Sequence, residues 1–83
     1  MTYTINRTSV TTVAEILAAN ANAVKRLVKN EGGDVVYIGG DSSVTTSNGF
    51  PVSAGEELLI NDYSGAIYAI SAGTTTVEVV EHQ

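Results

Sequence analysis

The residues most able to do acid–base chemistry are the only histidine, His82, and the adjacent carboxylates Glu56 and Glu57. A hydrolytic triad would require the imidazole to be held beside a serine and a carboxylate, whereas His82 lies at the chain end, where residues are usually poorly ordered. Glu56 and Glu57 could act as acid and base if they shared one site. Neighbouring residues of a strand point to opposite faces, which would separate them. The sequence therefore predicts no catalytic residues and no enzyme.

Metal and cofactor binding have as little support in the sequence. The chain has no cysteine, which excludes disulfides and thiolate metal sites. Acidic and amide side chains occur in turn-rich segments, at Asp34, Asp41, Asn61 and Asp62. Their spacing does not match a calcium loop with its terminal glutamate, and turn formation explains them. We expect no metal ion and no cofactor.

The charge of the chain is unevenly distributed. The net charge is −5, and every residue that carries a positive charge lies at or before Lys29. An acidic surface repels a phosphate backbone, so nucleic acid is not an expected partner. No apolar run approaches the roughly 18 residues of a membrane helix, and no signal-peptide pattern opens the chain. The split suits head-to-tail contacts between copies, although scattered solvated charge is the simpler interpretation.

From residue 34 onward, β-forming runs alternate with turns. The runs at residues 34–38, 56–60, 66–70 and 74–80 are rich in β-branched, aromatic or other apolar residues, and glycine or asparagine separates them. Short strands at a spacing of roughly 8–12 residues are typical of a sandwich or barrel. We therefore expect an all-β fold, a small antiparallel β-sandwich or barrel of six to eight short strands, in a single β domain over residues 1–83.

Residues 13–30 allow two interpretations. Apolar residues recur at helical spacing through this segment, and a capping-box pattern begins at Thr12. Against a helix stand Asn20 and Asn22, because an asparagine inside a helix costs roughly half a kcal/mol relative to alanine. The alternative is two strands joined by a turn at residues 20–22. Local rules favour the helix.

Two predicted strands carry apolar side chains on both faces, at residues 35–38 and 58–60. A sandwich with one solvated face should show cleaner alternation, so we expect Val36, Ile38 and Leu59 to contact another chain. A domain of this size buries only roughly 60–65% of its extended surface. Partner chains are a common source of the missing stability, and self-association is therefore expected.

Tyrosine side chains are further candidates for contacts with other proteins. Tyrosine combines a large apolar face with a polar tip, which suits an exposed anchor. Tyr63 lies in a predicted loop, and Tyr3 and Ile5 lie in the N-terminal segment. We expect these three residues to contribute to a protein-contact surface.

An ordered series of short motifs covers about four fifths of the chain. It runs through ILAAN (residues 16–20), KRLVKN (25–30), VYIG (36–39), VT (44–45), NGFPV (48–52), AGE (54–56), AIYAI (66–70) and VEV (77–79). Taken together, this series resembles a family of small tailed-phage virion accessory proteins, of the capsid decoration or fibre-base type. The resemblance implies a compact β fold, often trimeric, without enzyme activity or a cofactor.

The resemblance also bears on the ambiguous segment. In the family, the stretch that corresponds to residues 24–30 is a strand, and Asn30 ends it. We therefore predict strands within residues 13–30, with a turn near residues 20–22. The chain departs from the family at Ala23 and Val24, where further basic residues are common.

The function implied by the resemblance is that of a non-enzymatic viral structural protein. We expect a capsid decoration (cement) protein of a tailed bacteriophage, located in the virion as a homotrimer and bound to the major capsid protein or another virion protein. The alternative is a tail-fibre or head-fibre binding module that contacts a host receptor or glycan. We expect attachment to combine apolar contacts, through Tyr63 or the segment at Tyr3 and Ile5, with the acidic surface.

Overall fold

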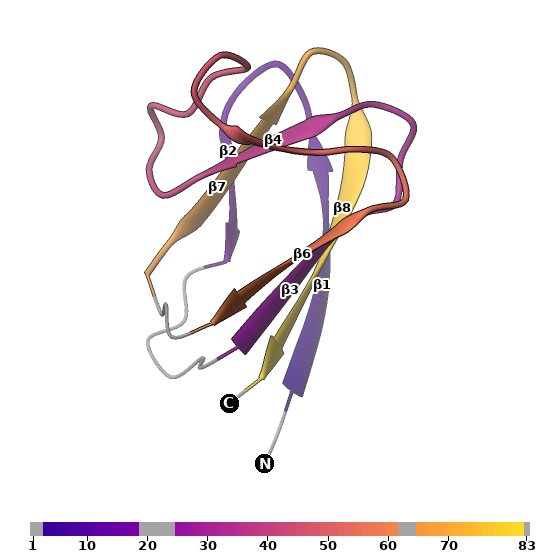
Figure 1. Ribbon diagram of the computed structural model, residues 1–83, viewed down its shortest axis with the longest axis vertical. Helices are drawn as coiled ribbons and strands as arrows, with labels where there is room; N and C mark the ends of the chain where they lie inside the picture. Colours follow the sequence, from indigo (N-terminus) through magenta and orange to yellow (C-terminus); the bar gives the residue numbers. More distant parts are fainter. Residues whose placement is uncertain (1–2, 19–24, 62–64, 83) are drawn as a thin grey trace.

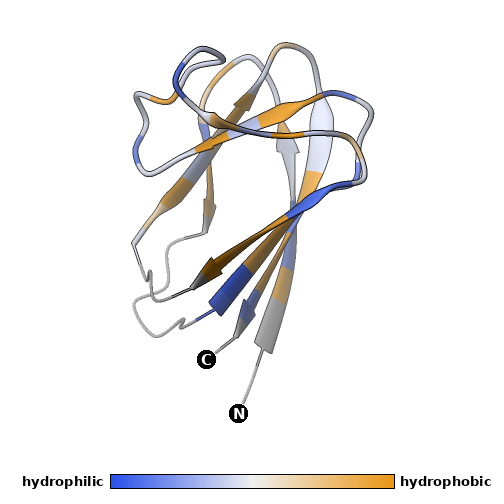
Figure 2. Cartoon of the chain, in the orientation of Figure 1, coloured by the Kyte–Doolittle hydropathy of each residue, from blue (hydrophilic) through white to orange (hydrophobic). Residues whose placement is uncertain are grey.

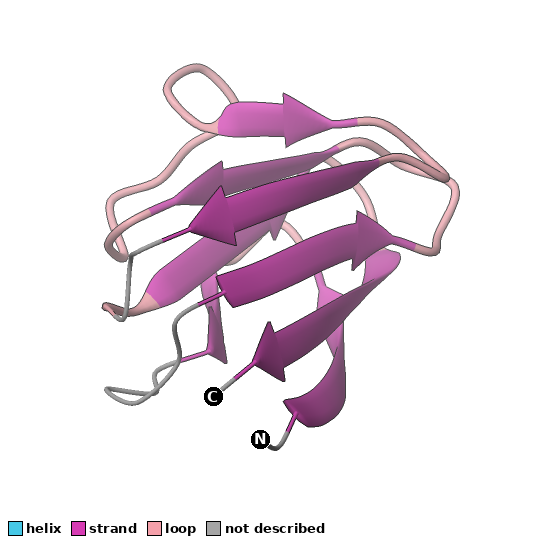
Figure 3. Cartoon of the chain, turned by 60° about the horizontal axis from the view of Figure 1, so that its bottom comes forward, coloured by secondary structure: helices cyan, strands magenta, loops and turns pink. Residues whose placement is uncertain are grey.

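The computed structural model describes residues 3–18, 25–61 and 65–82, and these residues form strands, turns and loops without a helix (Figures 1 and 3). The strands are β1 (Tyr3–Val10), β2 (Glu15–Ala18), β3 (Lys25–Asn30), β4 (Val36–Gly39), β5 (Phe50–Val52), β6 (Glu57–Asn61), β7 (Ile67–Ser71) and β8 (Thr75–His82). All strand pairs are antiparallel. The predicted all-β fold with six to eight short strands is confirmed.

The strands form two four-stranded sheets. The first sheet has the order β1-β8-β3-β6, and the second sheet has the order β2-β7-β4-β5. The chain thus pairs its first strand with its last, and the remaining pairs nest inside that pair. This winding of eight strands into two facing sheets is the jelly roll, a double-sheet architecture found in cupins, lectins and viral capsid proteins.

The described residues of the ambiguous segment contain two strands. β2 lies in the second sheet, and β3 lies in the first, hydrogen-bonded to β8 on one side and β6 on the other. Burial along β3 alternates from residue to residue, as the two faces of a strand require. The strand prediction is confirmed, and β3 ends at Asn30 as expected. The predicted turn at residues 20–22 lies outside the described residues.

The core lies between the two sheets and is built mainly from branched aliphatic side chains. Both sheets supply residues to it, as the spread of hydrophobic positions over the strands shows (Figure 2). The core residues are Val10, Leu17, Val28, Val36, Ile38, Val52, Ile67, Ala69, Val77 and Val79. Leu58 and Ile60 of β6 pack against this cluster at its open side.

Two predicted contact residues belong to this core, which corrects the prediction. Val36 and Ile38 of β4 are both buried by the chain itself, so neither side chain is available to another protein. The apolar pattern of residues 35–38 has an internal cause on both faces. The inward side chains fill the core, and the connection from β4 to β5 packs on the outward side.

That connection, residues 40–49, folds back over the outer face of β4. A Cβ added to Gly39 would lie 2.7 Å from Cβ of Val44, and one added to Gly49 would lie 2.6 Å from Cβ of Tyr37. Both glycines are therefore needed for the close approach of the loop to the sheet. Val44 is only 5% exposed as a result.

Candidate contact surface

The outer face of the first sheet carries a row of apolar side chains that crosses all four strands. Ile5 pairs with Val80, Val80 pairs with Leu27, and Leu27 pairs with Leu59. Residues directly opposite one another in antiparallel strands share a face of the sheet. Ile5 is 48% and Leu59 57% exposed, and Leu27 and Val80 are partly exposed. We call these four residues the apolar row.

A row of charged side chains lies beside the apolar row, two residues along each strand. Arg7 pairs with Glu78, Glu78 with Lys29, and Lys29 with Glu57. The sign therefore alternates from β1 to β6 as positive, negative, positive, negative. Arg7 contacts Glu78 at 3.4 Å (Nη2 to Oε2). We call these four residues the charged row.

On the other side of the apolar row, the strands continue through one more register position. There Tyr3 pairs with His82, His82 with Lys25, and Lys25 with Asn61. Tyr3 is thus a direct extension of the strand that carries Ile5, although its side chain lies outside the described part of the structure. Tyr63 lies outside the described residues, and its contact role stays a prediction.

The structure places two of the predicted contact residues in the same row on one face of the first sheet. Ile5 and Leu59 lie far apart in the sequence but stand at opposite ends of the apolar row. Sequence reasoning missed Leu27 and Val80, which complete the row between them. A signal was present, since Leu27 and Val80 each lie next to a buried valine, Val28 and Val79. Adjacent apolar residues in a strand place one side chain on the outer face.

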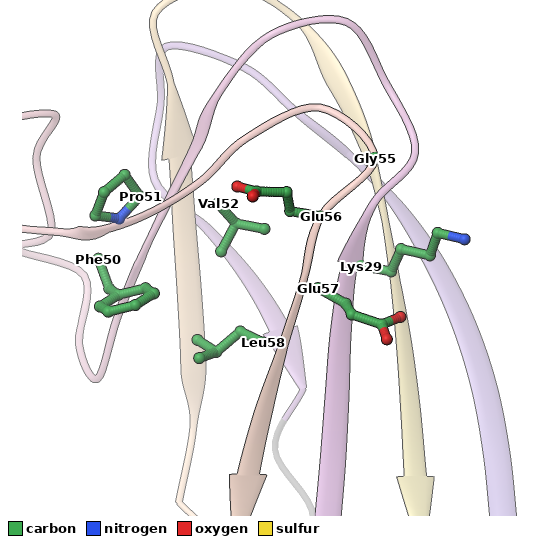
Figure 4. Close-up of a pocket in the computed structure, with 8 residues that line it drawn as sticks. All are labelled: Lys29, Phe50, Pro51, Val52, Gly55, Glu56, Glu57 and Leu58. Carbon is green, nitrogen blue, oxygen red and sulfur yellow. The ribbon is translucent and has the colours of Figure 1, made fainter.

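A groove runs along the open side of the sandwich, between the edge strands β5 and β6. Its volume is about 650 Å³, and it is lined by Lys29, Phe50, Pro51, Val52, Gly55, Glu56, Glu57 and Leu58. Figure 4 shows Phe50, Val52 and Leu58 grouped at one end, with Lys29 and Glu57 directed away from them. Phe50 is exposed, and sequence reasoning did not single it out.

The adjacent glutamates at the start of β6 have different surroundings. Glu56 accepts a hydrogen bond from the backbone N–H of Ser53, 3.2 Å from its Oε1, and so closes the turn before β6. Glu57 belongs to the charged row, in register with Lys29. Glu56 thus serves turn formation, whereas Glu57 stands at the end of the charged row.

The inner face of the first sheet holds a buried ion pair that the sequence did not reveal. Arg26 is fully buried, and its Nε lies 3.0 Å from Oε2 of the nearly buried Glu81, its cross-strand partner. Arg26 also donates to the carbonyl oxygen of Gly65. A charge removed from water in this way is stable only when it is paired and hydrogen-bonded. The pair therefore fixes how β3 and β8 align.

Asn30, at the end of β3, ties three parts of the chain together. Its side-chain amide donates to the carbonyl oxygens of Asp34 at 2.6 Å and Val52 at 2.9 Å. Its Oδ1 accepts from the N–H of Gly32 at 3.1 Å and from the hydroxyl of Thr75 at 2.7 Å. All the hydrogen-bonding groups of this buried side chain are thus satisfied, so its role is structural.

Asp41 shapes the loop that covers β4. The hydroxyl and the backbone N–H of Ser43 both donate to its carboxylate, the latter at 2.9 Å. These hydrogen bonds favour the ionised form and lower the pKa of Asp41. The acidic residue expected to serve turn formation does so here.

Within the described ranges, no three histidine, cysteine or acidic residues gather in a group able to hold a metal ion. The same part of the chain contains no helix of the length and hydrophobicity that would cross a membrane.

Comparison with known proteins gives structural matches only. No protein-family model matches the chain, and no curated protein matches its sequence. The fold is similar to that of a cupin-2 domain containing protein from Shewanella frigidimarina, with a TM-score of 0.66 and 12% identity over 98% of this chain and 71% of that one. It is also similar to a protein from Neisseria meningitidis, with a TM-score of 0.61 and 11% identity over 98% and 74%. Identities this low establish a shared fold alone.

Proposed function

We propose that this chain is a non-enzymatic structural protein of a tailed-phage virion, and that it decorates the capsid by packing against other protein chains. The observation that carries the proposal is the apolar row on the outer face of the first sheet. Large apolar side chains exposed together on a flat face usually mark a contact with another protein. The polar groups buried in the core are engaged with one another, which leaves them a structural role.

The fold is compatible with this role but does not select it. The jelly roll occurs in viral capsid proteins and in cupins alike, and a fold by itself does not define a function. What supports a structural role is the site: a broad face with apolar and charged rows in register. The family resemblance of the sequence supplies the virion and the major capsid protein as the expected setting.

Attachment to a shell would rest on many weak contacts repeated over the particle. A surface ion pair contributes only about 0–1 kcal/mol, so a single acidic residue cannot hold the protein. An oligomer that engages several equivalent sites binds far more tightly, because the later contacts are intramolecular. The exposed ring of Phe50, at the groove between β5 and β6, is an apolar contact site separate from the apolar row.

The test is binding of the purified protein to shells that lack it, titrated with salt. We expect binding to persist in about 0.5 M salt, where charges are screened beyond roughly 4 Å, because apolar contacts dominate. Release at that concentration would contradict apolar attachment. Failure to bind shells at any salt concentration would contradict the decoration role itself.

A tail-fibre or head-fibre module that binds a host glycan is a second candidate, and the groove favours it. An exposed aromatic ring such as Phe50 can stack on a sugar, and Glu56 and Glu57 could accept hydrogen bonds from its hydroxyls. The copy number in the particle separates the two functions. A decoration protein is abundant and binds shells, whereas a fibre module is scarce and binds host cells, and Phe50→Ala would abolish that binding.

A further inference from the structure

We infer that the outer face of the first sheet is the interface between two copies of this chain, related by a two-fold axis that runs parallel to the strands between β8 and β3. The inference rests on the proposed function, since it names the partner that the apolar row contacts. It replaces the expected trimer with a dimer.

The described residues leave the apolar row uncovered. Ile5 and Leu59 expose about half of their surfaces at the two edges of the sheet. Among the described residues, the connection that folds over a sheet is residues 40–49, and it packs on β4 of the second sheet. A flat apolar row across four strands is the surface that a second sheet would pack against face to face.

The charged row identifies that second sheet as a copy of the first. Its order from β1 to β6 is positive, negative, positive, negative: Arg7, Glu78, Lys29, Glu57. A two-fold axis along the strands reverses this order in the facing copy. Every position then meets the opposite sign, with Arg7 against the partner's Glu57 and Lys29 against the partner's Glu78. Cross-strand pairing within one chain also favours alternating signs, and Arg7 contacts Glu31 and Glu78 of its own chain. The alternation nevertheless makes the row complementary to a reversed copy of itself.

The same axis brings the apolar rows into contact. Ile5 would face the partner's Leu59, and Leu27 would face the partner's Val80. An axis along the row, perpendicular to the strands, would place the charged row against the position of Lys25 and lose the pairing. A three-fold contact joins two different patches of the surface, so it would not use the self-complementarity of the row.

The size of the face sets the strength of the contact. Four strands spaced about 4.8 Å apart, with five to eight residues at about 3.3 Å each, present roughly 400–450 Å² per copy. Roughly 800–900 Å² would be buried in total, which is below the roughly 1,200–2,000 Å² of stable complexes and in the range of weak, transient ones. We therefore expect a reversible dimer with a dissociation constant on the order of micromolar.

The test uses two variants, each with a single charge reversal. Dimerisation is measured first for each variant alone and then for their mixture. In Lys29→Glu, the partner's Glu78 would face a carboxylate, and in Glu78→Lys, the partner's Lys29 would face an ammonium. Each occurs twice in the dimer, so we expect each variant to dimerise roughly 10- to 100-fold more weakly than the unmodified chain. Mixing the two variants restores opposite signs at both positions, and the heterodimer should form with nearly the original affinity.

A matched control separates this interface from a general charge effect. Glu15→Lys makes the same change of charge as Glu78→Lys, but at an exposed position of β2 in the other sheet. Mixed with Lys29→Glu, it should give no heterodimer enrichment in native mass spectrometry. Circular dichroism of each variant checks the fold, since Lys29 and Glu78 are also cross-strand neighbours within one chain.

Three outcomes would overturn the inference: an unmodified chain that stays monomeric, a trimer, or variants whose mixture forms no heterodimer. The shell-binding assay on the same samples keeps the proposed function separate. A monomer that binds shells would overturn the dimer alone. A charge-paired dimer that never binds shells would leave the dimer standing and contradict the decoration role.

Discussion

The outer faces of the two sheets differ in their residue types and in how far other parts of the chain cover them. The second sheet presents neutral residues, with Tyr37 aligned with Ile70 and Pro51, and Tyr68 aligned with Ile16. Residues 40–49 fold onto this face, and their Val44 becomes buried there. The first sheet has apolar and charged rows in register and keeps Ile5 and Leu59 exposed. The described residues thus cover part of the second sheet and leave the outer face of the first sheet uncovered.

This contrast shows that the exposure of an apolar residue has to be interpreted together with the residues around it. Ile16 on the second sheet is as exposed as Ile5 on the first. Ile16 lies beside the partly buried Tyr68, without charged residues aligned in the strand next to it. Ile5 begins a row that spans the sheet and runs beside alternating charges. Only the second arrangement has the extent and complementarity of an interface.

The largest expected effect is a loss of stability on disruption of the Arg26–Glu81 ion pair, which opposes a change of register between β3 and β8. A slip of one residue between β3 and β8 would exchange the inner and outer faces, and the Arg26–Glu81 pair opposes it. Glu81→Ala should lower the free energy of unfolding by about 3–5 kcal/mol, because it leaves Arg26 buried without its carboxylate. Urea denaturation measures the loss.

A double variant controls this prediction. Arg26→Met combined with Glu81→Leu removes both charges and should recover most of the stability, since apolar residues of similar size replace a buried pair at little cost. A double variant as unstable as Glu81→Ala would mean that the loss of stability does not come from the unpaired charge of Arg26.

The second prediction concerns a variant that weakens the packing of residues 40–49 on the second sheet. Val44→Ala deletes two buried methyl groups and should cost about 2 kcal/mol of unfolding free energy. Amide exchange in β4 should become faster, while the dissociation constant of the dimer stays unchanged. A weakened dimer would mean that the second sheet, and not the first, forms the contact.

The third prediction alters the uncovered sheet. Leu59→Ser should change the unfolding free energy of the monomer by no more than about 0.5 kcal/mol, because the side chain is exposed. It should nevertheless weaken association by at least roughly tenfold, since Leu59 occurs twice in the interface. Ile16→Ser, an equally exposed position on the other sheet, is the matched control and should associate normally in sedimentation experiments.

The smallest effect is a dependence on pH in the covering loop. The hydrogen bonds from Ser43 place the folded pKa of Asp41 below the unfolded one. Their stabilising contribution is therefore complete above the unfolded value, about 3.9, and disappears as the pH falls through the folded pKa. The Ser43 amide resonance should shift over this acidic range. The Ser47 amide, which donates to the hydroxyl of Thr45, should not follow it.

The class of fold could be predicted from the sequence because its turns are explicit. Glycine and asparagine separate β-forming runs throughout the second half, so β4, β6, β7 and β8 were located closely, whereas β5 was not among the predicted strands. β3 was harder, since its inward positions include Arg26 and Asn30 beside Val28. Such a strand lacks a regular apolar alternation, and the helical spacing of its neighbours matched equally well. The resemblance to a family decided it correctly.

The winding and the contact surface could not be predicted in the same way. The pairing of β1 with β8 joins the two ends of the described chain, and no local pattern encodes so distant a partner. Val36 and Ile38 were assigned to a contact with another chain because both faces of their strand are apolar, and the loop that packs on its outward face was not foreseen. Ile5 and Leu59 were identified individually, but their alignment through Leu27 and Val80 depends on the register of three strand pairs.

The most direct test of the account is the mass of the chain in solution as a function of concentration, measured by sedimentation equilibrium. We predict a rise from the 8.6 kDa of a single chain to twice that mass through the micromolar range. Leu59→Ser should remain at the lower mass at the same concentrations. A constant 8.6 kDa for the unmodified chain, or a plateau at three times that mass, would contradict the account.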